Sequence, residues 1–202
     1  MRRVFQLFAG LQSFAVITAA YVICHGLTAW VVTPVQGVFL PEITVFASLA
    51  YLPHGVRVLA VWLLGWRAVL PLAAGAFLSE LIFTDAGVRQ VMEPVLLESI
   101  AVGAVAAFAA FEIARMFGWN LYAGQARRIA WTSLLAVGAL ASLINSSGQS
   151  VVFSGLIFPE DQLPVMAIYA AGDLVGLAVC MLALTLVFRW IRLTGKQRCR
   201  QE

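Results

Sequence analysis

Residues 165–190 read VMAIYAAGDLVGLAVCMLALTLVFRW, and this stretch decides the class of fold. Only Asp173 and Arg189 carry charge in it, and Arg189 stands next to its end. A helix needs about 17–25 mostly apolar residues to cross a bilayer, so this stretch predicts a membrane span. A membrane barrel would instead need short segments that alternate in polarity, and the sequence has none.

Five further apolar stretches precede it, at residues 4–32, 43–64, 68–83, 95–117 and 129–153. The second is interrupted by Pro53-His54-Gly55-Val56-Arg57, and the third is short. Helices are expected throughout, because a backbone exposed to lipid has to satisfy its own hydrogen bonds. We predict an all-α polytopic bundle of about six transmembrane helices, with one domain over residues 1–194 and a short basic cytoplasmic tail at 195–202.

The composition agrees with this class. Of the 202 residues, 62% are hydrophobic and 11% are charged, which is about half the charged fraction of a soluble domain. The basic residues flank apolar stretches and form no stripe, which excludes a nucleic-acid partner. Cys24, Cys180 and Cys199 show no disulfide or metal spacing. No catalytic motif, metal site or cofactor site is expected, so the protein is predicted not to be an enzyme.

Orientation follows from the basic residues, because cytoplasmic loops of membrane proteins are enriched in Lys and Arg. If the N-terminus is cytoplasmic, eleven of the thirteen Lys and Arg residues fall on the cytoplasmic side. Arg89 alone falls outside, and Arg57 lies within a span. This asymmetry favours an even number of spans, with both termini in the cytoplasm.

Ionisable groups within spans cost roughly 2.5–3.5 kcal/mol each on insertion scales, so each needs a reason. Most polar residues of the spans fall in their outer halves. Either they satisfy one another and fix the helix arrangement, or they line a ligand cavity that opens outward. We expect Arg57 to pair with Asp173. The candidate site residues are His25, His54, Arg57, Glu80, Glu98, Asn145, Gln149 and Asp173.

The predicted outer loops are acidic. They carry Glu42, Asp85, Glu93, Glu160 and Asp161 against Arg89 alone. Such a surface attracts cations and repels anions over a screening distance of about 8–10 Å. Any small ligand that enters from the outer side is therefore expected to be neutral or cationic.

Two elements of the sequence resemble a known family. Residues 51–59, YLPHGVRVL, are followed by LLGWRAVLP at 63–71 and by a helix rich in Gly and Ala. Residues 171–176, AGDLVG, are similar to a Gly-Asp-x-x-Gly element in a late helix. In this order the two elements resemble the membrane-associated sensor (MASE) domains of the first family, and the resemblance covers most of the chain.

The resemblance implies a multi-pass sensor of the bacterial inner membrane that takes part in signal transduction. With no output domain in the sequence, it would act through a membrane protein partner or a homo-oligomer. Gly172-x-x-x-Gly176 offers a close-packing face, either between helices of this chain or toward a partner. Two alternatives stay open. One is an accessory structural subunit of a larger membrane complex. The other is the substrate-binding subunit of an energy-coupling-factor vitamin transporter. Such subunits often have an Ala-x-x-x-Ala motif in their first helix, and Ala15-x-x-x-Ala19 resembles it.

The predicted topology is directly testable. Reporter fusions after Arg128 and at the C-terminus should report the cytoplasm, and fusions at Arg89 and Asp161 should report the outer side. Two reporters that are active on opposite sides of the membrane measure this. A C-terminus found outside would contradict the even number of spans.

Overall fold

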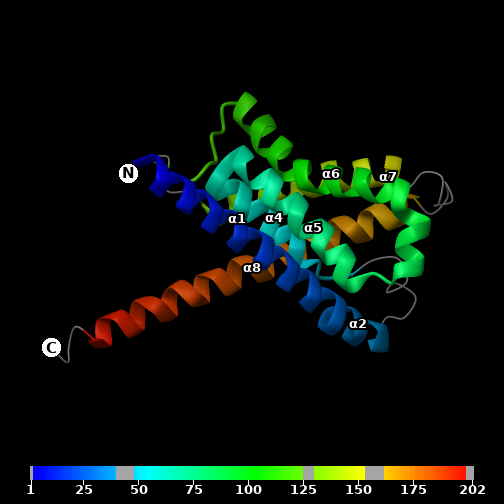
Figure 1. The fold of residues 1–202 in the computed structure, drawn as a ribbon, viewed down its shortest axis with the longest axis horizontal. Coiled ribbons are helices and arrows are strands. Elements are labelled where there is room, and N and C mark those ends of the chain that lie inside the picture. Colours follow the sequence, from blue (N-terminus) through cyan, green and yellow to red (C-terminus); the bar gives the residue numbers. More distant parts are fainter. Residues whose placement is uncertain (1, 40–47, 125–129, 153–161, 199–202) are drawn as a thin grey trace.

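A computed structural model describes residues 2–39, 48–124, 130–152 and 162–198, and it describes side chains within 10–39, 48–87, 95–124, 130–152, 166–190 and 192. The described part of the chain is helical (Figure 1). The elements are α1 (Arg2–Leu27), a π-helical turn η1 (Thr28–Val32), α2 (Thr33–Phe39), α4 (Leu52–Leu64), a 3₁₀ turn η2 (Gly65–Ala68), α5 (Val69–Phe83), α6 (Ala86–Met116), α7 (Trp131–Val152) and α8 (Gln162–Arg198).

Five helical segments are long and apolar enough to cross a membrane, which confirms a multi-pass membrane protein. They are Gly10–Phe39, Leu52–Phe83, Val95–Met116, Trp131–Val152 and Met166–Trp190. The second of them joins the second and third predicted spans. Helix α4 begins only at Leu52, well after the predicted start at residue 43. Helix α8 runs through to Arg198, so residues 195–198 of the predicted tail are helical.

The segment Leu52–Phe83 reverses direction at η2. Helix α5 runs parallel to α1, whereas α4 runs antiparallel to α1, so α4 and α5 point in opposite directions. Gly65 has φ +60° at this reversal, a conformation that suits glycine. The contacts are Thr18 with Pro71 and Gly26 with Phe83 for the parallel pair, and Thr28 with Leu52 and Tyr21 with Arg57 for the antiparallel pair.

The remaining helices continue this alternation. Helices α6 and α7 are antiparallel, with Ser99 beside Gln149, and α7 and α8 are antiparallel, with Ser142 beside Asp173. The start of α1 and the end of α8 consequently lie at the same end of the molecule (Figure 1). In the described part of the chain, α4 and α5, α6 and α7, and α7 and α8 therefore run in opposite directions.

Helices α4 and α5 are short, with 13 and 15 residues, or about 20 and 22 Å of rise. A hydrocarbon core is about 30 Å thick. Residues 48–51, which precede α4, are not helical and lie within the bundle against α8. Non-helical backbone at such a depth has to be satisfied by the protein. Three amides of this segment and of the α4 start donate to other elements: Leu49 to Gln36 Oε1, Tyr51 to the Gly172 carbonyl and Leu52 to Thr28 Oγ1.

The close approach to α8 depends on Gly172 and Gly176. A Cβ at Gly172 would collide with the carbonyl oxygen of Ser48, and a Cβ at Gly176 would collide with the carbonyl group of Tyr51. Small residues permit such backbone contact in membrane bundles. The glycine pair that the sequence offered for helix packing therefore serves an intramolecular contact.

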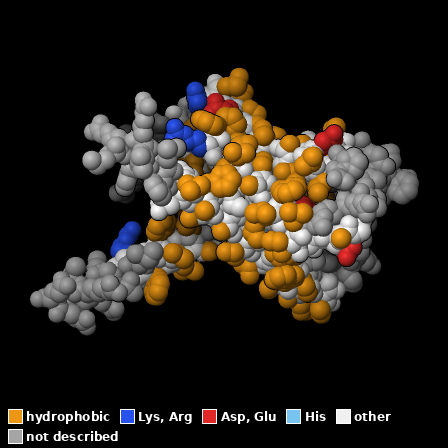
Figure 2. Space-filling view, in the orientation of Figure 1, with side chains coloured by type: hydrophobic (Ala, Val, Ile, Leu, Met, Phe, Trp, Pro, Cys, Tyr) orange, Lys and Arg blue, Asp and Glu red, His pale blue; other side chains and the backbone are white. Residues whose placement is uncertain are grey.

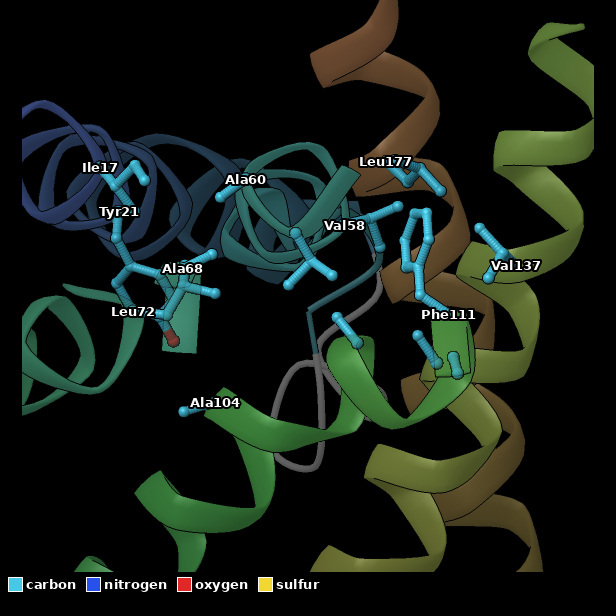
Figure 3. Close-up of a cluster of buried hydrophobic side chains, with 14 of the residues drawn as sticks. Ile17, Tyr21, Val58, Ala60, Ala68, Leu72, Ala104, Phe111, Val137 and Leu177 are labelled. Carbon is cyan, nitrogen blue, oxygen red and sulfur yellow. The ribbon is translucent and has the colours of Figure 1, made fainter. Parts of the chain in front are cut away.

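Apolar side chains from all helical segments form a core in the half of the bundle near η2 and the end of α6. Figure 3 shows these side chains converging, among them Val58, Leu72, Phe111 and Leu177. Many members of the core are alanines, so the helices approach each other closely. The polar residues of the bundle interior, described below, occupy the other half.

The end that carries both termini has the features of a membrane interface. In Figure 2 the Lys and Arg side chains lie toward this end, and hydrophobic side chains cover the middle of the molecule. Trp66, Trp119, Trp131 and Trp190 are exposed, as expected for anchoring rings. An ion pair lies within α6 near this end, with 3.2 Å between Arg115 Nη1 and Glu112 Oε1.

Tyr122, in the segment that follows α6, makes a hydrogen bond to the carboxylate of that ion pair. Its hydroxyl donates to Glu112 Oε1 at 2.7 Å, and its ring stacks on Phe111 with 5.2 Å between centroids. Partial burial raises the pKa of the Tyr122 phenol, and the hydrogen bond to Glu112 acts in the same direction. The neighbouring amide of Ala123 donates to the carbonyl of Trp62, which fastens this segment to α4.

The glycine contacts predict a selective loss of stability. Gly172→Ala and Gly176→Ala should each cost about 2–3 kcal/mol, because the new methyl group meets backbone atoms that cannot rotate away. That corresponds to roughly 4–12 °C in the Tm of the detergent-solubilised protein. Gly10→Ala is the matched control, since a Cβ there meets nothing within 4 Å. Equal Tm values for all three variants would contradict the contact.

Candidate functional site

A polar cavity of about 180 Å³ lies inside the bundle. All six helical segments and the segment before α4 contribute to its wall. It is placed in the half of the bundle away from the termini, close to the ends of α5 and α7 at Phe83 and Val152. We name it the Arg57 cavity. Its lining residues are Tyr21, Ser48, Tyr51, Arg57, Ala76, Glu80, Ser99, Ile100, Asn145, Gln149, Tyr169 and Asp173.

The guanidinium group of Arg57 is held on several sides. Arg57 is 6% exposed. Its Nη2 donates to the Tyr21 hydroxyl at 2.7 Å, and its Nη1 lies 3.5 Å from Asn145 Oδ1, a long hydrogen bond. The ring centroids of Tyr21 and Tyr51 lie 5.5 and 5.6 Å from its Cζ, within cation–π range. A Cβ at Gly103 would lie 2.6 Å from Nη2, so this glycine of α6 leaves room for the group.

Asp173 is held by two other residues. Its Oδ2 accepts from Ser142 Oγ at 2.9 Å and lies 3.3 Å from Nδ1 of His54. His54 Nε2 lies 3.2 Å from the Gly138 carbonyl and therefore carries the hydrogen. Nδ1 and Oδ2 are not aligned for a hydrogen bond. Both side chains are buried, so this 3.3 Å contact joins α4 to α8 inside the bundle.

These contacts correct the predicted pairing. Arg57 and Asp173 line the same cavity, but within the described residues they form no direct ion pair, and the partner of Asp173 is His54. The predicted second span, residues 43–64, was interrupted only at residues 53–57, whereas residues 48–51 are not helical. Because α4 begins at Leu52, its first turn brings His54, and not Arg57, onto Asp173. Arg57 reaches toward the N-terminal end of its helix, as side chains on helices do, and meets Asn145.

Four other candidates are distributed as follows. Glu80 and Gln149 line the Arg57 cavity, and Gln149 Nε2 donates to the Ser99 carbonyl at 3.1 Å. His25 lies outside the cavity lining and stacks on Phe83, with 5.4 Å between ring centroids. Glu98 is exposed on α6 and does not line the cavity.

The acidic residues of the predicted outer loops are described only in part. Asp85 is exposed and caps α6. The other side chains lie outside the described residues: Glu42, Glu93, Glu160 and Asp161.

Sequence reasoning missed the phenol and hydroxyl groups of the site. Tyr21, Tyr51 and Tyr169 were not chosen because a tyrosine in a span is an ordinary interface or packing residue. The sequence contains one weak indication of their role, because Tyr51 lies close to the Pro-His-Gly element that carries His54. Ser142 was also missed, although it lies three residues before Asn145 and therefore on the same face of α7.

A larger pocket, about 760 Å³, lies between α6 and α7 near the end that carries the termini. Its wall is mainly apolar and includes Ile113, Phe117 and Leu140. Phe117 and Trp119 beside it are exposed. A pocket of this composition at the edge of a membrane bundle suits lipid chains, and it lacks the convergent charged groups that distinguish the Arg57 cavity.

Comparison with protein-family models, with curated proteins and with solved structures finds no match to this chain. The chemistry of the Arg57 cavity therefore has to be derived from its own groups: one guanidinium, two carboxyl groups, three phenols, two amides and two hydroxyls. Ser142 Oγ donates to Asp173 and not to His54, so these three residues do not form a nucleophile with its base. The arrangement is suited to hold a small polar molecule.

The geometry predicts which residues are energetically coupled. His54→Ala and Asp173→Ala should each cost about 1–3 kcal/mol, because each removes one partner from a buried polar contact. The double variant should lose clearly less than the sum, whereas Arg57→Ala with Asp173→Ala should be closer to additive. Denaturation of the detergent-solubilised protein measures all three. The exposed Glu112–Arg115 pair is the reference, with an expected coupling below about 1 kcal/mol. Additive losses for His54 and Asp173 would contradict the contact.

Proposed function

We propose that this protein is a MASE-like sensor of the bacterial inner membrane, which binds a small ligand in the Arg57 cavity and acts through a membrane partner. It crosses the membrane six times with both termini in the cytoplasm, which places the cavity in the outer half of the bilayer. In this proposal the protein binds and signals, and it catalyses no reaction.

One observation carries the proposal: the two elements that resemble the MASE family meet at the cavity. Residues 51–57 supply Tyr51 and Arg57 to the cavity wall, and residues 172–176 supply Asp173. His54 of the first element contacts Asp173 from outside the lining, and both glycines of the second element pack against the chain at residues 48–51. The elements are far apart in the sequence. Their direct packing gives the resemblance a physical basis, because each element is shaped to receive the other.

The polar interior supports binding over a purely structural role. A structural network would be expected to satisfy its own groups, since an unpartnered buried polar atom costs about 1–3 kcal/mol. Several buried polar atoms of the cavity wall, including Arg57 Nε and Gln149 Oε1, have no hydrogen-bond partner among the described residues. A cavity bordered by such atoms is arranged for an occupant.

A substrate-binding subunit of a transporter is the second candidate, and one observation favours it. Ala15 and Ala19 are both exposed on α1, so the Ala-x-x-x-Ala face is available for a helix of another protein. Such a subunit would also bind a small molecule within the membrane. The two candidates differ in their partners, because transport requires an ATPase pair and sensing requires a kinase, a cyclase or a phosphodiesterase.

Ligand binding can be tested with a panel of small polar solutes: sugars, nucleosides, amines, carboxylates and amino acids. At 100-fold excess over its Kd, a ligand contributes about 2.7 kcal/mol, which raises the Tm of a protein of this size by roughly 5–10 °C. The increase should be smaller in Gly103→Ala, which displaces the guanidinium, and unchanged in Gly10→Ala. Chains that co-purify in mild detergent then distinguish sensor from transporter.

An accessory structural subunit gives a different result. No solute in the panel would then change the Tm, and the chain would purify in fixed stoichiometry with the components of a larger complex. That pair of outcomes would refute the sensor and the transporter proposals together.

A further inference from the structure

The unpartnered atoms of the Arg57 cavity define what its occupant has to offer. Within the part of the chain that the structure describes, three buried atoms of the lining residues have no hydrogen-bond partner: Arg57 Nε, Gln149 Oε1 and Ser48 Oγ. Nε is a donor only, whereas the amide oxygen is an acceptor only. Buried polar groups are nearly always satisfied. The occupant therefore presents an acceptor to Arg57 and a donor to Gln149.

The free edge of the guanidinium selects the acceptor. Nη2 and Nη1 are directed at Tyr21 and Asn145, and the rings of Tyr21 and Tyr51 flank the group. Nε is the nitrogen of this group that has no hydrogen-bond partner among the described residues. The position of the group is fixed before anything binds, which lowers the ordering cost of binding. A carboxylate suits such a donor best, because hydrogen bonds between two charged groups are the strongest.

The rest of the wall opposes an occupant that carries negative charge alone. Glu80 on α5 and Asp173 on α8 line the same cavity as Arg57. A simple carboxylate would meet both carboxyl groups, and a simple amine would meet the guanidinium. Like charges at short range cost several kcal/mol in a binding site. A molecule with one group of each sign can turn its anionic end to Arg57 and its cationic end to the carboxyl groups.

We infer that the Arg57 cavity binds a small zwitterion with one carboxylate and one protonated amine, the chemical class of a short amino acid. This inference rests on the proposed ligand-binding function. The volume of about 180 Å³ equals that of about six water molecules at roughly 30 Å³ each, which restricts the ligand to a compact solute. The protonated amine donates to Gln149 Oε1 and faces Asp173 and Glu80. The zwitterion has no net charge, so the predicted acidic outer loops would not repel it.

The test compares matched solutes on the detergent-solubilised full chain by calorimetry and by Tm. The probes are L-alanine, propionate, which lacks the amine, and ethylamine, which lacks the carboxylate. L-Alanine should bind at least tenfold more tightly than either of the others. Gly103→Ala should weaken alanine binding at least tenfold, and Gly10→Ala should leave it unchanged.

Charge variants make the test specific. Glu80→Gln should weaken alanine binding and strengthen propionate binding, because it removes a repulsive carboxylate. Arg57→Gln should weaken alanine and strengthen ethylamine. A residue with a merely structural role would weaken all three probes alike. If Arg57→Gln does not fold, Glu80→Gln and Gly103→Ala still decide the matter.

The outcomes separate this inference from the function on which it rests. Propionate or ethylamine binding as tightly as alanine would overturn the zwitterion, and so would a sugar or nucleoside that binds in a Gly103-dependent manner. Either result would leave the cavity as a ligand site. If no solute of the wider panel binds, the proposed ligand-binding function itself is overturned.

Discussion

A guanidinium group buried among six helices has to be solvated by the protein itself, and much of this structure serves that requirement. Arg57 obtains a hydroxyl from Tyr21, an amide oxygen from Asn145 and two aromatic faces. Gly103 has no side chain, which leaves room for the guanidinium group. Because its contacts come from α1, α7 and the segment before α4, the charge determines how these parts pack. A carboxylate as direct partner would have neutralised it, but Asp173 is engaged by His54 and Ser142.

The second constraint is that helix α4 starts inside the bundle. Ser48 and Tyr51, which line the cavity, belong to the non-helical segment before α4 and would lie elsewhere in a longer helix. Because α4 starts at Leu52, the segment before it is not helical. The amides of Leu49, Tyr51 and Leu52 donate to Gln36, Gly172 and Thr28. Broken helices of this kind are tolerated in membranes where they line a cavity. The interruption of the helix and the presence of a polar site are therefore one structural feature.

The helical membrane class and most helix positions could be predicted because hydropathy and length follow from the bilayer itself. The site was predicted in part: Arg57, Glu80, Asn145, Gln149 and Asp173 do share a cavity. Pairing was harder to predict. Whether His54 or Arg57 meets Asp173 depends on where α4 begins, and apolar residues 43–51 give no signal of a helix break. Glu98 and His25 failed as cavity residues because depth along a helix says nothing about which face points inward.

The long sequence separation within the site has a consequence for biosynthesis. Arg57 emerges from the ribosome well before Asn145, 88 residues later, and Leu52 precedes its partner Cys180 by 128 residues. Until α7 and α8 are made, Arg57 has Tyr21 and Tyr51 but lacks Asn145, and the amide of Tyr51 lacks the Gly172 carbonyl. The polar contacts of the second helix are therefore complete only after the last helix has been made.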